Sequence, residues 1–144
     1  MFYGRYGHSI DDKGRLILPS KVRMDLGLDV FVTRGIDRCL YLYPRVEWDR
    51  ISAKIHQLPL TSKPARQFRR FFYREASQLD VDKQGRILIP SYLREYAGLT
   101  NEVFLVGADD HVEVWDAAAY KQENTALELN PDALAENLSA LTTL

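Results

Sequence analysis

The sequence predicts an α+β protein in which two copies of one strand, turn, strand and helix unit are joined by longer helices. The first observation is a motif, D-x-x-G-R followed by three aliphatic residues and P-S-x-x-R, which occurs at residues 11–23 and again at residues 82–94. Agreement over so many residue types at a period of roughly 71 residues indicates an internal duplication. The second observation is that apolar residues between the two copies recur at helical spacing.

Each motif begins with a predicted tight turn. Asp11 can accept hydrogen bonds from backbone N–H groups of the turn, and Gly14 can adopt the positive φ that a bulged turn requires. Arg15 therefore follows directly after the tip of a hairpin. The equivalent residues of the second copy are Asp82, Gly85 and Arg86.

A short strand and a short helix follow each turn. The aliphatic runs at residues 16–18 and 87–89 predict strands that are buried on both faces. The proline after each run ends the strand. A serine start and a glycine stop then predict helices over residues 20–26 and 91–97.

Further strands are predicted on both sides of each motif. Apolar residues alternate loosely through residues 2–10, which predicts a strand leading into the first turn. Residues 30–33 and 39–43 are separated by a loop whose length suits a second hairpin. Residues 101–106 and 111–115 predict the same hairpin in the second copy.

The segment between the copies predicts a helical hairpin. Apolar residues from Trp48 to Leu58 recur at helical spacing, so we expect a helix from about Arg45 that turns Trp48 toward the interior. After a proline-containing break, a second amphipathic helix is expected to end near Gln78. A helix over residues 117–127 would correspond to the first helix of this pair.

These elements divide the chain into four predicted parts. Residues 1–58 form the first unit with its following helix, 59–78 the connecting helix, 79–127 the second unit with its helix, and 128–144 a C-terminal tail. An Asn-Pro pair in this tail predicts the start of a last helix. That helix is either a mobile tail or a segment that binds a partner.

Composition limits the function less than the motifs do. The 144 residues carry a net charge of −1, and no apolar run approaches the roughly 20 residues needed to span a bilayer. The single Cys39 cannot form an intrachain disulfide and the N-terminus lacks a secretory pattern, so we expect a cytoplasmic protein without a membrane partner. Basic residues are concentrated in the first two dozen residues and over residues 63–74, whereas the sequence beyond Lys121 is acidic or neutral.

Several features together resemble the MraZ family. They are residues 1–4, the two D-x-x-G-R motifs, residues 40–44 followed by Trp48, residues 97–99 and residues 113–116. The resemblance extends to about Tyr120 and implies two tandem AbrB-like swapped-hairpin β-barrel units with linking helices. It also implies assembly into rings, and regulation of transcription of the bacterial division and cell-wall gene cluster. Tyr3 departs from the pattern, because many relatives carry an arginine there.

We expect the DNA contacts to come from the turns and from the residues that follow them. The main candidates are Arg15, Lys13, Lys21 and Arg23, with Arg5, Arg86 and Lys83 as further candidates. Asp11 is expected to orient Arg15, while Gly14, Asp82 and Gly85 shape the turns. The alternative for each arginine is an ion pair with the aspartate of its own turn. Such an exposed pair contributes only about 0 to 1 kcal/mol, which is a weak reason to build it into both copies.

The sequence gives no indication of an enzyme. It has no glycine-rich phosphate loop, no G-x-S-x-G motif, and no cluster of residues with metal-ligand spacing. His8, His56 and His111 are therefore expected to be ordinary surface or packing residues. We expect no cofactor, no metal and no small-molecule substrate.

The predicted function is that of a sequence-specific transcriptional regulator that binds double-stranded DNA and is associated with the nucleoid. A few phosphate contacts alone give weak binding, so we expect a homo-oligomeric ring that engages several short direct repeats upstream of its promoter. Two alternatives stay open. One is a ring-forming scaffold that binds another protein, and the other is an antitoxin-like module whose tail binds a toxin.

Overall fold

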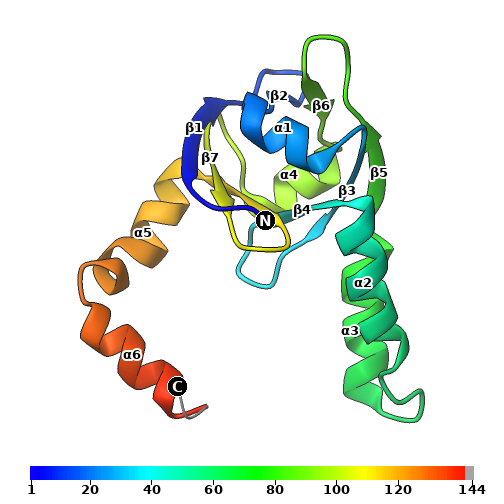
Figure 1. Ribbon diagram of the computed structural model, residues 1–144, viewed down its shortest axis with the longest axis vertical. Helices are drawn as coiled ribbons and strands as arrows, with labels where there is room; N and C mark the ends of the chain where they lie inside the picture. Colours follow the sequence, from blue (N-terminus) through cyan, green and yellow to red (C-terminus); the bar gives the residue numbers. More distant parts are fainter. Residues whose placement is uncertain (142–144) are drawn as a thin grey trace.

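The computed structural model describes residues 1–141, which form eight strands and six helices (Figure 1). The first copy forms β1 (Arg5–Ser9), β2 (Arg15–Ile17), α1 (Ser20–Leu26), β3 (Asp29–Arg34) and β4 (Leu40–Pro44). A helical hairpin of α2 (Arg45–His56) and α3 (Lys63–Arg74) follows. The second copy forms β5 (Ser77–Asp80), β6 (Arg86–Leu88), α4 (Ser91–Ala97), β7 (Glu102–Gly107) and β8 (Val112–Asp116), and the chain continues through α5 (Ala117–Glu128) and α6 (Pro131–Ser139). The predicted α+β class and the order of elements in each copy are confirmed.

The two copies exchange strands within the one chain. In the six-stranded sheet of residues 1–141, the strand order is β1-β7-β8-β4-β3-β5. Strand β1 of the first copy pairs with β7 of the second, and β5 of the second copy pairs with β3 of the first, both antiparallel. Strands β2 and β6 pair with each other in a separate two-stranded sheet, called the ribbon below. The swapped-hairpin arrangement is therefore formed inside a single subunit.

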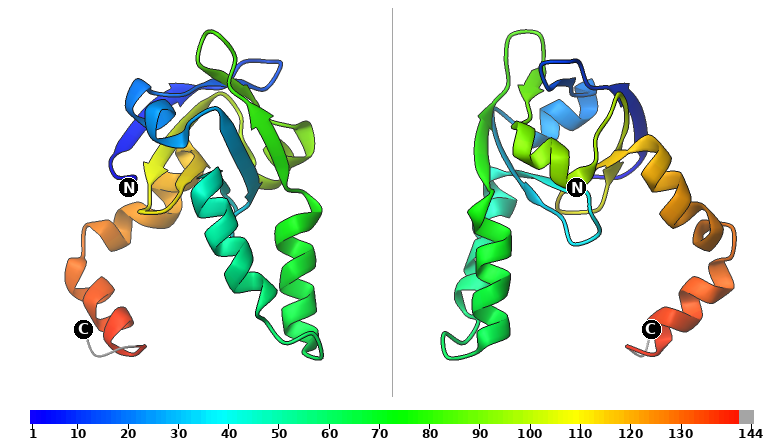
Figure 2. Two further views of the ribbon diagram at one scale, coloured as in Figure 1. Left: turned by 45° about the vertical axis from the view of Figure 1, so that its right-hand side comes forward. Right: turned by 180° about the vertical axis from the view of Figure 1, so that it is seen from behind.

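The predicted β-barrel is not confirmed. Within the described residues the six-stranded sheet does not close, because β1 and β5 lie at its two edges. The ribbon lies across one end of this curved sheet, with α1 and α4 on opposite faces of the molecule (Figures 1 and 2).

The main core lies under the ribbon and is filled by both copies. Leu16, Leu18, Ile87 and Ile89 are all 0 to 1% exposed. The prediction that the two aliphatic runs are buried on both faces is wrong, because the middle residues Ile17 and Leu88 are 49% and 55% exposed. One face of the ribbon packs on the core, and its other face is exposed within the part of the chain that the structure describes.

Helices α1 and α4 have the predicted bounds, but their serines do not cap them. Ser20 and Ser91 are the first helical residues, and the N-cap positions are Pro19 and Pro90. Neither end has a side-chain capping hydrogen bond within the described residues. Each serine therefore marks where its helix begins without capping it.

Aromatic packing holds the helical hairpin against the sheet. The Trp48 ring stacks on Phe31 of β3 and on Phe72 of α3, with centroid distances of 5.1 and 5.3 Å, so its expected inward orientation is confirmed. Helix α3 ends at Arg74 instead of near Gln78. The reason is long-range, because the chain from Ser77 onward forms strand β5 and pairs with β3.

Two helical arms, α2–α3 and α5–α6, project from the sheet on the side away from the ribbon (Figure 2). Helix α6 begins where predicted, and the side chain of its N-cap Asn130 accepts the N–H of Ala133. Helix α6, which carries Asp132 and Glu136, therefore lies far from the two turns. Among the helices of residues 1–141, none combines the length and the apolar character needed to cross a membrane.

Candidate nucleic-acid interface

The outer face of the ribbon brings together the two arginines of the repeated motif. Antiparallel pairing sets Arg15 opposite Leu88 and Ile17 opposite Arg86. These four side chains share the outer face, because the residue between each pair on the same strand points into the core. Diagonal neighbours of this kind, such as Arg15 and Arg86, lie about 7–8 Å apart.

The carboxylate of Asp11 organises the first turn and the arginine after it. Its Oδ1 accepts the backbone N–H groups of Lys13 at 3.0 Å and Arg15 at 2.9 Å. Its Oδ2 accepts the Nε–H of Arg15 at 2.6 Å. Gly14 donates its N–H to the Asp11 carbonyl oxygen at 2.9 Å. Its φ is 90°, a backbone angle that residues other than glycine rarely adopt. Asp11 therefore fixes both the turn and the direction of the guanidinium.

The second turn repeats this geometry. Oδ1 of Asp82 accepts the backbone N–H groups of Gln84 and Arg86, both at 2.9 Å, and Oδ2 accepts the Nε–H of Arg86 at 2.8 Å. Gly85 closes the turn with a φ of 78°. Both copies of the motif therefore hold their arginine in the same way.

These hydrogen bonds lower the pKa of both aspartates below the ordinary value. The main cause is the backbone N–H of the arginine, which donates to the carboxylate and favours its charged form. Partial loss of hydration acts in the opposite direction, and the hydrogen bond from the guanidinium adds to the lowering. At neutral pH both turns keep their ion pair.

The ion pair leaves part of each guanidinium available. The aspartates engage Nε of Arg15 and Arg86, and within residues 1–141 the Nη groups of both arginines make no hydrogen bond to protein. Two Nη groups in one plane form the fork that binds phosphate oxygens or the O6 and N7 atoms of guanine. An ion pair within the turn and a contact with DNA are therefore compatible.

Backbone hydrogen bonds tie each turn to the other copy. The N–H of Leu18 donates to the carbonyl oxygen of Gly85, and the N–H of Ile89 donates to that of Gly14, both at 2.9 Å. Each strand of the ribbon thus continues into contact with the opposite turn. The positions of the two arginines depend on both copies.

An arginine from each short helix packs on the turn of the other copy. Nε of Arg94 on α4 donates to the carbonyl oxygen of Ile89 at 3.1 Å, and a Cβ added to Gly14 would lie 2.7 Å from that Nε. Arg23 on α1 occupies the equivalent place over Gly85, where an added Cβ would overlap its Nη1. Each turn needs glycine both for its φ and because a guanidinium fills the space beside it.

Three of the other predicted DNA-binding residues lie near the ribbon. Lys13 and Lys83 are exposed in the first and second turns. Arg23 is half-buried against the second turn, not beside Arg15 of its own copy. Strand exchange explains this, since it places α1 next to the turn of the second copy.

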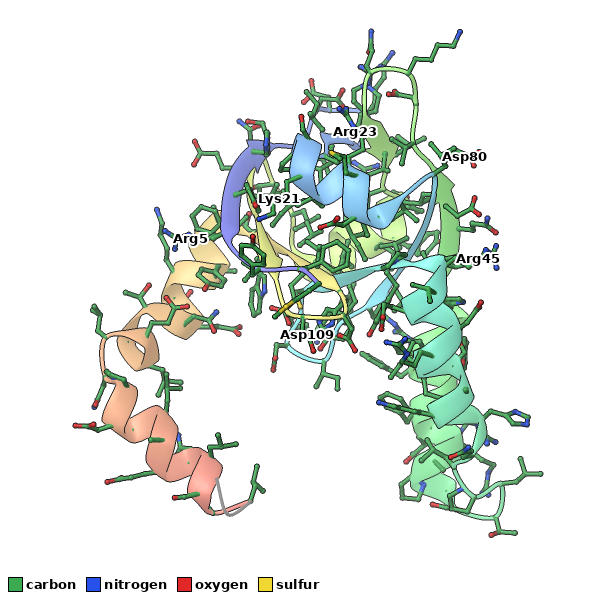
Figure 3. All side chains as sticks on the ribbon, viewed as in Figure 1. Arg5, Lys21, Arg23, Arg45, Asp80 and Asp109 are labelled. Carbon is green, nitrogen blue, oxygen red and sulfur yellow. The ribbon has the colours of Figure 1, made fainter. Side chains whose placement is uncertain are left out.

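Lys21 and Arg5 are held by aromatic rings away from the ribbon (Figure 3). Nζ of Lys21 lies 3.5 Å from the ring centroid of Tyr3. The guanidinium of Arg5 on β1 lies 4.7 Å from the ring centroid of Phe104. The structure thus separates these two cations from the group formed by the turns.

Sequence reasoning missed three residues of this surface. Arg94, the last residue of the second motif, is not among the predicted contacts, although it packs on the first turn. Ile17 and Leu88 were assigned to the core, although they lie between the arginines on the outer face. Period-two alternation would have indicated their exposure, but an unbroken aliphatic run hides that signal.

The basic run at residues 63–74 lies on α3, at the far side of the molecule from the ribbon (Figure 1). Nη2 of Arg69 donates to the carbonyl oxygens of His56 at 3.1 Å and Leu58 at 2.7 Å, where α2 ends. This part of the run stabilises the end of the helical hairpin and adds no charge to the ribbon surface.

Strand exchange between two copies of one unit, each with an arginine turn held by an aspartate, defines an internally duplicated swapped-hairpin protein. The sequence matches twice, at residues 1–71 and 72–139, the model of a family described as "MraZ protein, putative antitoxin-like". The chain belongs to the MraZ family.

Named relatives match over almost their whole length. A protein of Acetivibrio thermocellus is 46% identical over 141 residues, which cover 98% of this chain and 99% of the relative. A protein of Lactiplantibacillus plantarum is 46% identical over 138 residues, covering 96% and 98%. One of Syntrophomonas wolfei is 41% identical over 138 residues, covering 96% of each chain. All three are named transcriptional regulator MraZ.

Proposed function

We propose that this protein is a sequence-specific DNA-binding transcriptional regulator, and that the ribbon is the element that meets double-stranded DNA. The observation that carries the proposal is the convergence of Arg15 and Arg86 on one exposed face, each oriented by its own aspartate. A two-stranded ribbon fits the major groove, where the arginine fork has its matching acceptors. The names of the relatives, which are transcriptional regulators, support the same function.

The direct test replaces Arg15 or Arg86 by alanine. We expect each variant to lose about 10- to 100-fold in affinity for a duplex selected by the wild-type chain from random DNA, since a bidentate contact contributes about 1–3 kcal/mol. Affinity is measured by mobility shift over a series of salt concentrations. The wild-type affinity should fall steeply as salt rises, because phosphate contacts release counterions.

Arg50→Ala is the matched control. Arg50 is an exposed arginine of α2 that pairs with Glu47 at 2.6 Å, as Arg15 pairs with Asp11, but it lies on the helical hairpin. Its removal should leave DNA affinity unchanged. Unchanged affinity in both ribbon variants would refute the proposal, and loss of secondary structure in Arg15→Ala would assign that arginine to folding.

We also propose that the protein acts in the cytoplasm, associated with the nucleoid, as a homo-oligomeric ring on short direct repeats. The net charge of −1 supports the ring, because a single chain with so little charge would bind DNA weakly. Linked copies raise the effective concentration of the second site, which strengthens binding by about 10²- to 10⁴-fold. Exposed apolar residues on the arms, including Leu60 at 71% and Leu138 at 44%, support contacts between copies.

Operators with one, two and three copies of the selected site test the ring. Affinity should rise with the number of sites spaced near one helical turn, and should fall when half a turn is inserted between them. If the affinity changes neither with the number of sites nor with the half-turn insertion, one subunit binds alone.

A further inference from the structure

Two exposed aliphatic side chains lie between the arginines of the ribbon. Ile17 is 49% and Leu88 is 55% exposed, whereas Leu16 and Ile87, their neighbours in the chain, are 0 and 1% exposed. A single exposed aliphatic residue is ordinary at a protein surface. Here the two residues occupy the same position of the repeated motif, two residues after the arginine of each turn.

The register places each aliphatic side chain beside one arginine. Leu88 lies directly opposite Arg15, and Ile17 lies directly opposite Arg86. Side chains directly opposite in an antiparallel pair have Cβ atoms about 4.5–5.5 Å apart. The outer face therefore presents two mixed pairs, each with one guanidinium fork and one branched apolar group.

The major groove offers a matching pair of chemical groups. Guanine presents the O6 and N7 acceptors there, and thymine presents a C5-methyl group, the main apolar group on that edge of the base pairs. Base pairs stack about 3.4 Å apart along a strand, so cross-strand neighbours of the ribbon can reach neighbouring base pairs. Lys13 and Lys83 are exposed cations in the two turns that lead into these strands.

We propose that Ile17 and Leu88 determine sequence specificity by contacting thymine C5-methyl groups next to the bases that Arg86 and Arg15 contact. This inference rests on the proposed function and goes beyond it by assigning thymine recognition to two residues. An apolar contact made on binding excludes water from both surfaces, which stabilises the complex only where the methyl group is present. The arginines then supply affinity and guanine recognition, and the aliphatic pair distinguishes thymine from cytosine.

The test removes only the methyl group. Each thymine of a duplex selected by the wild-type chain from random DNA is replaced in turn by deoxyuridine, which keeps the same base-pairing edge. At the contacted positions the wild-type chain should lose about three- to five-fold in affinity at constant salt, the effect of one buried methyl group. Ile17→Ala and Leu88→Ala should bind the thymine duplex with this lower affinity. Replacing the thymine that the missing side chain would contact by deoxyuridine should not lower the affinity of that variant further.

Val46→Ala is the control, because Val46 is 62% exposed and belongs to helix α2, which lies away from the ribbon (Figure 1). It should keep the full dependence on the methyl group. Thermal melting checks the fold of each variant, and light scattering checks its assembly. A change of oligomeric state in Ile17→Ala or Leu88→Ala would identify the outer face as a contact between copies and would overturn the inference.

The two proposals fail in different ways. If the wild-type chain binds its selected duplex specifically and no deoxyuridine replacement lowers the affinity, thymine recognition is overturned and the regulator proposal stays intact. Methyl dependence that persists in both alanine variants also overturns it. If random DNA yields no selected duplex, the regulator proposal fails and this inference fails with it.

Discussion

The first turn, residues 11–15, and the second turn, residues 82–86, have nearly the same internal geometry but different surroundings. In each, a carboxylate accepts two backbone N–H groups and one arginine Nε–H, at distances of 2.6 to 3.0 Å. The atoms nearest to the space beside each glycine differ: they are Nε of Arg94 and the backbone oxygen of Ile89 beside Gly14, and the side chain of Arg23 beside Gly85. The duplicated motif thus keeps its local hydrogen bonds and the identity of its neighbours from the other copy, while the distances from those neighbours to the glycine differ.

The charges of the turns have diverged as well. The first turn has Lys13 and Arg15 against Asp11 and Asp12, and the second has Lys83 and Arg86 against Asp82 alone. The second turn is therefore the more basic of the two.

The largest expected difference between the turns is in their glycines. A Cβ at Gly14 would lie 2.8 Å from the backbone oxygen of Ile89, which cannot move without disturbing the ribbon. A Cβ at Gly85 meets the tip of the flexible Arg23 side chain. Both substitutions force a strained φ, so we expect Gly14→Ala to lower the free energy of unfolding by about 3 kcal/mol and Gly85→Ala by about 1 to 2 kcal/mol. Urea unfolding measures both.

Adding Arg23→Ala to Gly85→Ala sharpens this comparison. It should recover part of the loss, because it removes the side chain that the new Cβ meets. Equal losses in the two single glycine variants would show that φ strain dominates and that the surroundings contribute little.

A smaller difference is expected between the two covering arginines. Arg94 donates to the carbonyl oxygen of Ile89, so Arg94→Ala should lower the free energy of unfolding by about 1 to 2 kcal/mol. Within the described residues the Arg23 side chain donates no such hydrogen bond, and Arg23→Ala should change stability by about 0.5 kcal/mol or less. Thermal unfolding of the two variants, measured side by side, would contradict this view if Arg23→Ala were the less stable.

The smallest expected effect is on the stability of the fold at acid pH. The pKa values of Asp11 and Asp82 are lower in the folded protein than their ordinary value of 3.8. Their ionised forms therefore stabilise the fold above about pH 4, and this contribution is lost as the pH falls through the lowered pKa values. Replacing either aspartate by asparagine should flatten the acid side of the stability profile by a similar amount, because the two environments match. A profile that changes with only one of the two replacements would show that the turns differ in solution.

Turns and helix bounds could be predicted from the sequence wherever residues close together in the chain determine them. Aspartate and glycine at fixed spacing specified both turns, and the proline, serine and glycine positions gave the bounds of α1 and α4. Helical periodicity located α2 and the inward face of Trp48. The end of α3 could not be found in this way, because pairing of Ser77 with a strand far away in the chain overrides the helical pattern.

The sequence by itself determined two Asp-x-x-Gly-Arg turns and the short elements around them, because hydrogen bonds within five residues hold each turn. Only the tertiary structure decided that Arg15 and Arg86 share one face, that Arg23 serves the opposite turn, and that Ile17 and Leu88 are exposed. These outcomes depend on exchange of strands between the copies. The register of β2 against β6 joins residues far apart in the chain, and no local pattern encodes which partner a strand will find.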